Sequence, residues 1–272
     1  MRVAVVGHVE WVEFVPVDHV PVAGEIIHAA ETWGEPAGGG GVAAVQLARL
    51  AGAASFFTAL GDDQLGERSR TRLAELGVAV HAAQRSEPTR RAFTYLDRAG
   101  ERTITTLGQR LQPRGSDHLP WAALAETDAV YFTAGDAEAA RRARAARVLV
   151  GTPRAAGALD AVPADAIVLS AHDDDERAAV AAMTPAPALL IATEGGAGGS
   201  WRSASGASGR WNAAVPPGPV VDQYGAGDCF AAGLTFALAA GLATEKAIAL
   251  AARCGAWCAS GRGPFEGQLR TP

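Results

Sequence analysis

The chain has 272 residues, of which 49% are hydrophobic and 6% aromatic, a composition typical of a folded globular protein. Its length fits one large α/β domain or two small ones, and we expect a single domain over 1–272. A formal net charge of −5 argues against a nucleic-acid or anionic-membrane partner, and no apolar run reaches the roughly 20 residues that span a bilayer. Three cysteines form a sparse, odd set, which favours free thiols in a reducing compartment, so we expect a cytoplasmic protein.

Apolar runs of strand length alternate with stretches of helical periodicity along most of the chain. This alternation is the signature of parallel βαβ units, in which helices cover a mainly parallel sheet. The predicted strands lie at 2–7, 55–60, 129–133, 147–150, 166–170 and 188–193. The predicted helices lie at 41–52, 63–76, 136–146, 173–182, 226–241 and 244–260. A segment rich in Gly and Ser, 195–209, is expected to form loops around a hairpin.

Two segments, about 10–35 and 90–107, interrupt the alternation and predict a second, smaller sheet. The first holds an extended stretch from Trp11 to Val17 and a β-rich piece at 25–30, and the second predicts a hairpin with its turn at 97–100. Strands inserted at two separate places favour a sheet that stands over one edge of the main domain as a lid. A β-flap with no part in catalysis is the alternative interpretation.

Near the C-terminus, an extended stretch leads into Gly225, Ala226 and Gly227, which open a long apolar helix. The unpaired N–H groups and the positive dipole end of such a helix start attract phosphate oxygens, and small residues let a phosphate come close. Asp228 would then lie where it can accept the proton of an attacking hydroxyl group during phosphoryl transfer. The structural alternative is an ordinary helix start with an acidic residue in its first turn.

A run of glycines at 38–41 formally matches the dinucleotide-binding fingerprint of dehydrogenases. That fingerprint must follow the first strand directly, whereas here Glu35, Pro36 and Ala37 precede the glycines and the first strand ends at Gly7. A dehydrogenase is therefore disfavoured. No G-x-x-x-x-G-K-[S/T] sequence is present to indicate a P-loop kinase.

The stretch D-Q-Y-G-A-G-D-C-F at 222–230 resembles the C-terminal signature D-T-x-G-A-G-D-x-F of the PfkB, or ribokinase-like, carbohydrate kinases. The stretch at 37–52 looks like the N-terminal signature of that family, a Gly-Gly turn followed by a helix ending A-R-L-G. Shorter matches at 61–66, 100–104 and 193–196 fall in the family's order, so the resemblance covers nearly the whole chain.

This resemblance implies a ribokinase-like three-layer α/β sandwich with a mainly parallel central sheet and a small β-sheet lid. It also implies an ATP-dependent kinase that phosphorylates a hydroxyl of a sugar, sugar derivative or nucleoside. The lid of family members frequently forms a dimer interface, so a homodimer is a further expectation. A catalytically weak protein that senses a ligand or nucleotide on the same fold is the alternative function.

The resemblance implies roles for individual residues as well. For catalysis, the expected base is Asp228 and the expected anion hole is Gly225, Ala226 and Gly227. The residues expected near ATP are Thr193, Glu194, Gly195, Cys254 and Gly261. The residues expected near the substrate are Glu10, Glu13, Gly38, Gly39 and Arg90. Family members use Mg²⁺, often assisted by K⁺, and the residues expected beside these ions are Asp175 or Glu176 for Mg²⁺ and Asp222 for K⁺.

The chain departs from the family pattern at the end that would select the substrate. Many members hold sugar hydroxyls with an Asn and an Asp from the first lid strand, but the stretch here is G-H-V-E-W-V-E at 7–13, and Val42 stands where the first signature has Asn. A substrate with an aromatic group that stacks on Trp11 is one interpretation, and packing of Trp11 in an interface is the other.

Arg90 follows Thr89 at the start of the predicted hairpin. One interpretation is that Arg90 binds a phosphate group already present on the substrate, and the other is that it is a solvated charge at a strand edge.

Overall fold

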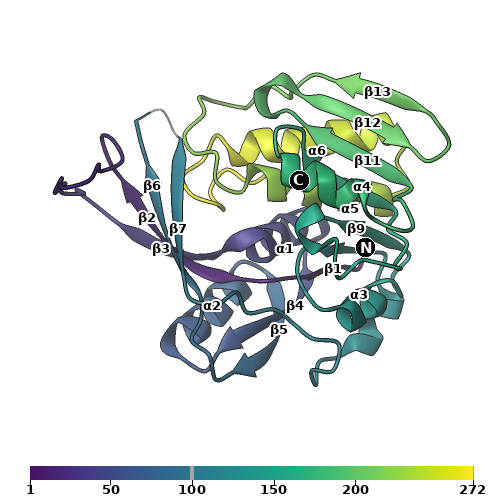
Figure 1. Ribbon diagram of the computed structural model, residues 1–272, viewed down its shortest axis with the longest axis horizontal. Coiled ribbons are helices and arrows are strands. Elements are labelled where there is room, and N and C mark those ends of the chain that lie inside the picture. Colours follow the sequence, from purple (N-terminus) through teal and green to yellow (C-terminus); the bar gives the residue numbers. More distant parts are fainter. Residues whose placement is uncertain (99–100, 272) are drawn as a thin grey trace.

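The computed structural model describes residues 1–98 and 101–271. A nine-stranded sheet runs through the molecule in the order β13-β12-β11-β10-β9-β8-β1-β4-β5, and all its pairings are parallel except those of the hairpin β12–β13 at one edge (Figure 1). Its strands are β1 (Val3–Val6), β4 (Ala54–Gly61), β5 (Val78–Arg85), β8 (Ala129–Phe132), β9 (Val148–Gly151), β10 (Ala166–Ser170), β11 (Leu189–Thr193), β12 (Gly199–Ser203) and β13 (Ser208–Trp211). The mainly parallel α/β architecture is confirmed, whereas the expectation of a single domain stays a prediction.

Helices pack on both faces of this sheet and give three layers. They are α1 (Gly38–Ala51), α2 (Gln64–Glu75), α3 (Ala137–Ala143), α4 (Asp174–Ala181), α5 (Ala226–Ala239) and α6 (Thr244–Cys258), with short 3-10 turns η1 (Trp121–Glu126), η2 (Pro153–Ala155) and η3 (Gly195–Ala197). Side chains alternate across a strand, so Val3 and Val5 of β1 join the core with α1, α5 and α6, while Ala4 and Val6 join the core with α3 and α4.

Each strand and helix predicted for the main sheet is present, with ends that differ by a few residues. One strand of this sheet, β5, had no counterpart among the predictions. It is an edge strand whose residues are mostly half-buried or exposed, so it lacks the continuous apolar run that marks a strand buried on both faces. The expected hairpin near 195–209 is present as β12 and β13.

A second sheet of four strands forms the predicted lid and stands out from the main sheet at the left of Figure 1. Its order is β3-β2-β6-β7, with β2 at Glu10–Pro16, β3 at Trp33–Ala37, β6 at Arg91–Leu96 and β7 at Arg102–Leu107. The strand predicted at 25–30 is wrong: Ile26 there is 84% exposed, and β3 comes later, where it pairs with β2 and runs directly into α1. Part of the predicted turn at 97–100, residues 99 and 100, lies outside the described residues.

Candidate active site

A cleft of about 1040 Å³ lies between the lid and one edge of the main sheet. The carboxyl ends of four parallel strands reach it, through Thr133 after β8, Thr152 after β9, Ser170 of β10 and Thr193 of β11. The lid contributes residues of β2 and β7, and the starts of α1 and α5 close the floor. Ligands of open α/β sheets bind at this edge, so the cleft is the candidate active site.

The start of α5 forms one wall of the cleft. Gly225 has a φ of 80°, and a Cβ there would lie 2.8 Å from Cγ1 of Val42, so the left-handed turn and the close packing both require glycine. In the described part of the chain, the N–H groups of Gly227 and Asp228 have no hydrogen-bond partner. Beyond its chain neighbours and the backbone of its own helix, no atom lies within 4 Å of where a Cβ of Gly227 would be. The first turn of α5 thus presents free N–H groups to open space, as an anion site needs.

Asp228 lies where the starts of α1 and α5 meet. A Cβ placed on Gly39 would lie only 2.9 Å from Oδ1 of Asp228 and 3.1 Å from Oγ1 of Thr133, so the two helix starts approach without an intervening side chain. Burial raises the pKa of Asp228 to about 6, against the opposing charges of Arg154 and Arg102. A carboxylate with a pKa in this range suits a general base at neutral pH.

Two charged residues accompany Asp228 at this end of the cleft, which we call the transfer end and define by Asp228, Arg154 and Glu176. Nε of Arg154 lies 3.1 Å from Oε1 of Glu176, whose other oxygen accepts a hydrogen bond from the N–H of Ser170 at 2.8 Å. The pKa of Arg154 is raised because Glu176 and Asp228 face it, despite the opposing effect of burial. Arg154 therefore holds positive charge beside the candidate base.

The part of the cleft next to the lid, which we call the lid end, is defined by His8, Glu10, Arg90 and Arg110. Nε of Arg90 lies 3.3 Å from Oε2 of Glu10, yet neither atom makes a hydrogen bond, and Nδ1 of His8 is also buried without a partner. Burial, then Arg110 and Arg90, lower the pKa of His8 to about 3, so its ring is neutral. Burial raises the pKa of Glu10, and Arg90 opposes that shift. These unpaired polar atoms suit the hydroxyls of a bound molecule.

The lid also contacts the loop before α5. Nη1 of Arg102 donates to the carbonyl of Gln223 at 3.3 Å, and Nε2 of Gln223 donates to Oε1 of Glu101 at 2.8 Å. The start of β7 is thereby joined to the segment that carries Asp228. The lid covers the cleft rather than standing clear of it.

Most of the residues predicted from the sequence line this cleft. They are Glu10, Gly38, Gly39, Arg90, Thr193, Gly195, Gly225, Ala226, Gly227 and Asp228. Segments more than 200 residues apart in the chain are brought together in this way. Placement in the cleft does not test the role of any of them, so their roles stay predictions.

Two predictions on strand β2 need correction. Glu13 and Trp11 point away from the cleft, because they alternate with Glu10 and Val12 along the strand, and Nε1 of Trp11 donates to Oε1 of Glu13 at 2.9 Å. Trp11 is only 3% exposed, and the guanidinium of Arg68 lies 4.1 Å from its ring centre. Stacking of a substrate on Trp11 is therefore wrong, and the tryptophan packs inside the chain instead.

Three residues predicted near ATP lie outside the cleft lining. Cys254 is fully buried against α5, where a Cβ on Gly233 would lie 2.7 Å from its sulfur; the cleft is lined instead by its neighbours on α6, Ala252, Gly255 and Ala256. Gly261 packs against the backbone of Gly267. Glu194 makes a bidentate ion pair with Arg210, in which Nη1 and Nη2 of the arginine lie 3.1 and 2.7 Å from the two carboxylate oxygens. This ion pair lowers the pKa of Glu194.

Of the three residues predicted beside metal ions, Asp175 and Asp222 lie outside the lining. Asp175 is exposed in the first turn of α4, and Glu176 is the residue of that acidic run that reaches the cleft. Asp222 is buried, and its two oxygens accept hydrogen bonds from the N–H groups of Tyr224 at 2.8 Å and Gly263 at 3.0 Å. No group of three or more His, Cys, Asp or Glu side chains among the described residues could hold a metal ion.

Sequence reasoning missed several residues of the cleft. Thr133, Thr152 and Arg154 follow buried parallel strands, so the rule that ligands bind at the carboxyl ends of such strands is a signal that finds them. His8 follows β1 in the same way. Arg110 lies in an irregular stretch after β7, where no periodicity or motif marks it, and only the fold brings it to the cleft.

Comparison with known sequences gives a family match and a similar enzyme. The model of the family described as pfkB family carbohydrate kinase matches residues 1–158 and 163–270. The chain is 32% identical over 290 residues to a fructokinase of Klebsiella pneumoniae, with 86% of this chain and 91% of that protein covered. Among the described residues, no helix has the length and hydrophobicity needed to cross a membrane.

Solved structures of ribokinases share the fold. A putative ribokinase from Agrobacterium tumefaciens superposes with a TM-score of 0.83 at 22% identity, over 99% of this chain and 94% of that chain. The ribokinase of Arabidopsis thaliana complexed with ribose and ATP gives 0.77 at 20% identity, over 99% of this chain and 96% of that chain. The ribokinase-like fold, with its main sheet and smaller lid sheet, is thus confirmed.

Proposed function

The chain belongs to the pfkB family of carbohydrate kinases and is a kinase, and from that premise we propose that Asp228 is the base in transfer of the γ-phosphoryl group of ATP to a substrate hydroxyl. The acceptor is a sugar, sugar derivative or nucleoside. One observation carries the proposal: Asp228, with its raised pKa, faces the cleft beside the free N–H groups that open α5. Use of ATP follows from the family.

In the proposed reaction, the substrate hydroxyl lies against Asp228, and its oxygen attacks the γ-phosphorus. The bond between that phosphorus and the bridging oxygen breaks, ADP leaves, and the hydroxyl proton passes to the carboxylate of Asp228. Phosphoryl transfer has a loose transition state, so the protein mainly positions the groups and neutralises charge. The N–H groups of Gly227 and Asp228 and the guanidinium of Arg154 supply that neutralisation.

The nucleotide would lie along the C-terminal half of the cleft. Thr193 and Gly195 line its wall near the end of β11, and the small residues Ala252, Gly255 and Ala256 of α6 leave room for a flat base. These α6 residues replace Cys254 and Gly261 as the proposed adenine contacts. The structural neighbour whose title names ribose and ATP supports a nucleotide and a sugar on this fold.

Mg²⁺ and K⁺ are proposed as cofactors. Mg²⁺ is usually held by one or two carboxylates, water and substrate phosphates, and Glu176 provides a carboxylate at the transfer end, where the ion would neutralise phosphate charge. Asp222 is a buried carboxylate with no ion-pair partner among the described residues, and burial raises its pKa, which fits a monovalent cation nearby. Location in the cytoplasm and dimerisation through the lid stay predictions.

The test is an assay of ADP release with a panel of sugars and nucleosides, comparing the wild type with Asp228→Asn and with Asp175→Asn, whose carboxylate is exposed outside the cleft. We expect Asp228→Asn to lower kcat by about 10²–10⁴-fold, the usual contribution of general base catalysis, and Asp175→Asn to leave it unchanged. Undiminished turnover by Asp228→Asn removes the assignment of the base. Ligands that raise the melting temperature without any turnover favour the sensing protein instead.

A further inference from the structure

Arg110 is a positively charged residue of the cleft lining whose side chain pairs with no described residue. It lines the lid end and is half-buried, and its guanidinium makes no ion pair or hydrogen bond with any described residue. The other arginines of the cleft each have a partner in this part of the chain: Arg90 lies beside Glu10, Arg102 donates to Gln223, and Arg154 contacts Glu176. A half-buried cation costs free energy unless an anion accompanies it.

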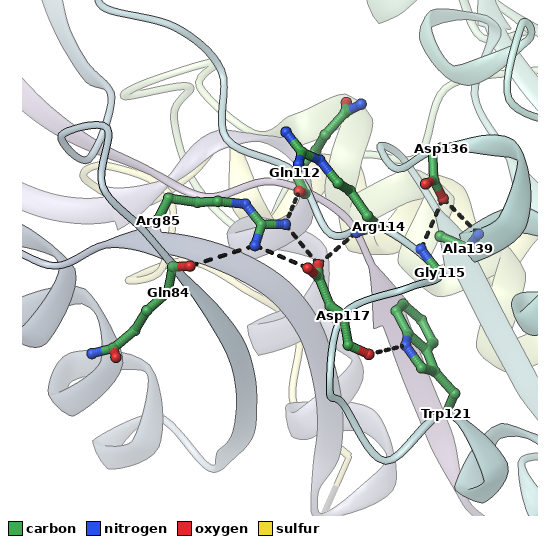
Figure 2. A network of polar contacts seen from close by, with 9 residues as sticks. All are labelled: Gln84, Arg85, Gln112, Arg114, Gly115, Asp117, Trp121, Asp136 and Ala139. Atoms are coloured by element: carbon green, nitrogen blue, oxygen red, sulfur yellow. Dashed lines mark hydrogen bonds and ion pairs between the residues drawn. The ribbon is translucent and has the colours of Figure 1, made fainter.

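The loop that carries Arg110 is firmly held just beyond it, as Figure 2 shows. Arg85 at the end of β5 binds both carboxylate oxygens of Asp117, at 2.9 and 2.6 Å, and also donates to the carbonyl of Gln112 at 3.2 Å. Both side chains of this ion pair are largely buried, at 13% and 11% exposure. Asp136 then binds the N–H of Gly115 at 2.9 Å. The backbone just beyond Arg110 is therefore fixed, so little backbone entropy is lost when Arg110 binds a ligand.

The lid end has more positive than negative charge. Arg90 and Arg110 face one carboxylate, Glu10, while His8 is neutral because burial, these two arginines and Arg154 lower its pKa. Burial, and then the charges of Arg90 and Arg154, lower the pKa of Arg110 as well, whereas Glu10 opposes that shift. The charges present do not balance, and an anion between the two guanidinium groups would restore the balance.

The residues around Arg110 favour an anion of the phosphoryl acceptor over the phosphates of ATP. The transfer end already has its own cation, Arg154, which faces Asp228 and Glu176. Oε2 of Glu10 and Nδ1 of His8 are buried without partners at the lid end, and both can accept hydrogen bonds from hydroxyl groups. The lid end therefore offers two arginines for an anionic group and two acceptors for hydroxyls, on the acceptor side of the cleft.

We propose that the phosphoryl acceptor carries an anionic group, a carboxylate or a phosphate, which Arg110 and Arg90 bind at the lid end. This deepens the proposed function and rests on it, because the anion is assigned to the molecule that receives the phosphoryl group. Arg suits either source, since its planar guanidinium binds carboxylate and phosphate through paired hydrogen bonds. Binding of the anion needs no chemistry, so it is measurable apart from turnover.

The experiment measures binding by calorimetry in the presence of saturating ADP, which fills the nucleotide region and cannot donate a γ-phosphoryl group. Three probes share a ketohexose body: fructose, fructose 6-phosphate, and 2-ketogluconate, in which a carboxylate replaces the terminal hydroxymethyl group. The variants are Arg110→Gln, Arg110→Lys and the matched control Arg114→Gln. The side chain of Arg114 is exposed, lies in the same loop, and makes no hydrogen bond or ion pair with any described residue.

We expect at least one anionic probe to bind the wild type about tenfold to a hundredfold more tightly than fructose, as two charged hydrogen bonds imply. Arg110→Gln should remove that preference while leaving fructose binding unchanged, Arg110→Lys should restore part of it, and Arg114→Gln should match the wild type. The tighter of the two anionic probes identifies carboxylate or phosphate as the source.

Equal binding of all three probes, absence of binding by both anionic probes, or a preference that survives in Arg110→Gln overturns the proposal. Failure of the proposed function is recognised separately, by the ADP-release assay: a protein that prefers anionic probes but phosphorylates none of the acceptors tested retains the anion site and loses the kinase mechanism. A protein that phosphorylates only neutral sugars, with Asp228 required, retains the mechanism and loses the anion site.

Discussion

The side-chain oxygen of Tyr224 accepts a hydrogen bond from the N–H of Gly38 at 3.2 Å and so joins the loop before α5 to the first residue of α1. These two residues are 186 positions apart in the chain. The Tyr224 ring also packs edge-on against Phe14 of lid strand β2, with ring centres 5.0 Å apart. One side chain thus connects the anion-binding loop, the glycine turn and the lid.

Substitution Tyr224→Phe should destabilise the protein and weaken substrate binding. It leaves the buried N–H of Gly38 without its acceptor, at a cost of about 1–2 kcal/mol in free energy of unfolding, while Phe keeps the packing against Phe14. Urea unfolding and KM for the acceptor are the measurements. An unchanged free energy of unfolding would show that the hydrogen bond between Tyr224 and Gly38 does not stabilise the protein.

Activity should depend on the ionisation of Asp228. Burial raises its pKa to about 6, and a base must be deprotonated, so kcat/KM should rise as the pH increases through about 6 and level off above it. A pH profile of kcat/KM under non-denaturing conditions is the measurement. A profile that is flat between pH 5 and 7 would contradict this assignment.

The same pKa predicts an effect on stability. Because the folded-state pKa lies above the ordinary value of 3.8, the neutral carboxyl stabilises the folded state at low pH, and this contribution is lost as the pH rises from about 4 through about 6. Asp228→Asn removes the charge, so its melting temperature relative to the wild type should be higher at pH 8 than at pH 4. Scanning calorimetry at both pH values provides the test, and an equal difference at both would count against a buried charge.

His8 should make the protein less stable as the pH falls. Burial and three arginines lower its folded-state pKa from 6.5 to about 3, so below about pH 6.5 the unfolded chain binds a proton that the folded protein does not. Melting temperatures measured from pH 7.5 to 4.5 should fall less steeply for His8→Gln than for the wild type. The exposed His118→Gln is the control and should follow the wild type. Parallel curves for all three proteins would rule out the effect.

Two glycines of the cleft should respond differently to alanine. A Cβ on Gly39 lies 2.9 Å from Oδ1 of Asp228, so Gly39→Ala should displace the carboxylate and reduce kcat. A Cβ on Gly227 meets no atom beyond its chain neighbours and the backbone of its own helix, and alanine favours a helix over glycine by about 1 kcal/mol, so Gly227→Ala should be at least as stable as the wild type. It should nevertheless raise KM for ATP, because the new methyl group fills the space proposed for phosphate.

Steady-state kinetics with ATP varied, together with urea unfolding, separate these two outcomes. An unchanged KM for ATP in Gly227→Ala would place the phosphates elsewhere in the cleft. Full activity of Gly39→Ala would mean that the start of α1 can move away from Asp228 at little cost.

Local patterns in the sequence were enough to predict the main sheet apart from β5 and the exact strands of its hairpin, the six α-helices and the start of α5. Strand and helix periodicity depend on neighbouring residues, and the requirement of Gly225 and Gly227 at a turn into a helix is local as well. The strand at 33–37 was missed for the opposite reason: pairing with β2 decides it, and its own residues are no more β-prone than those at 25–30.

The sequence by itself determined the fold class and the segment that we propose handles phosphate, since Asp228 and its glycines lie within one short stretch. Only the tertiary structure decided the lid end. It turned Trp11 toward Arg68, selected Glu176 rather than Asp175 from an acidic run, and brought Arg110 beside Arg90. These choices depend on which way side chains from separated segments point, and no local pattern encodes that direction.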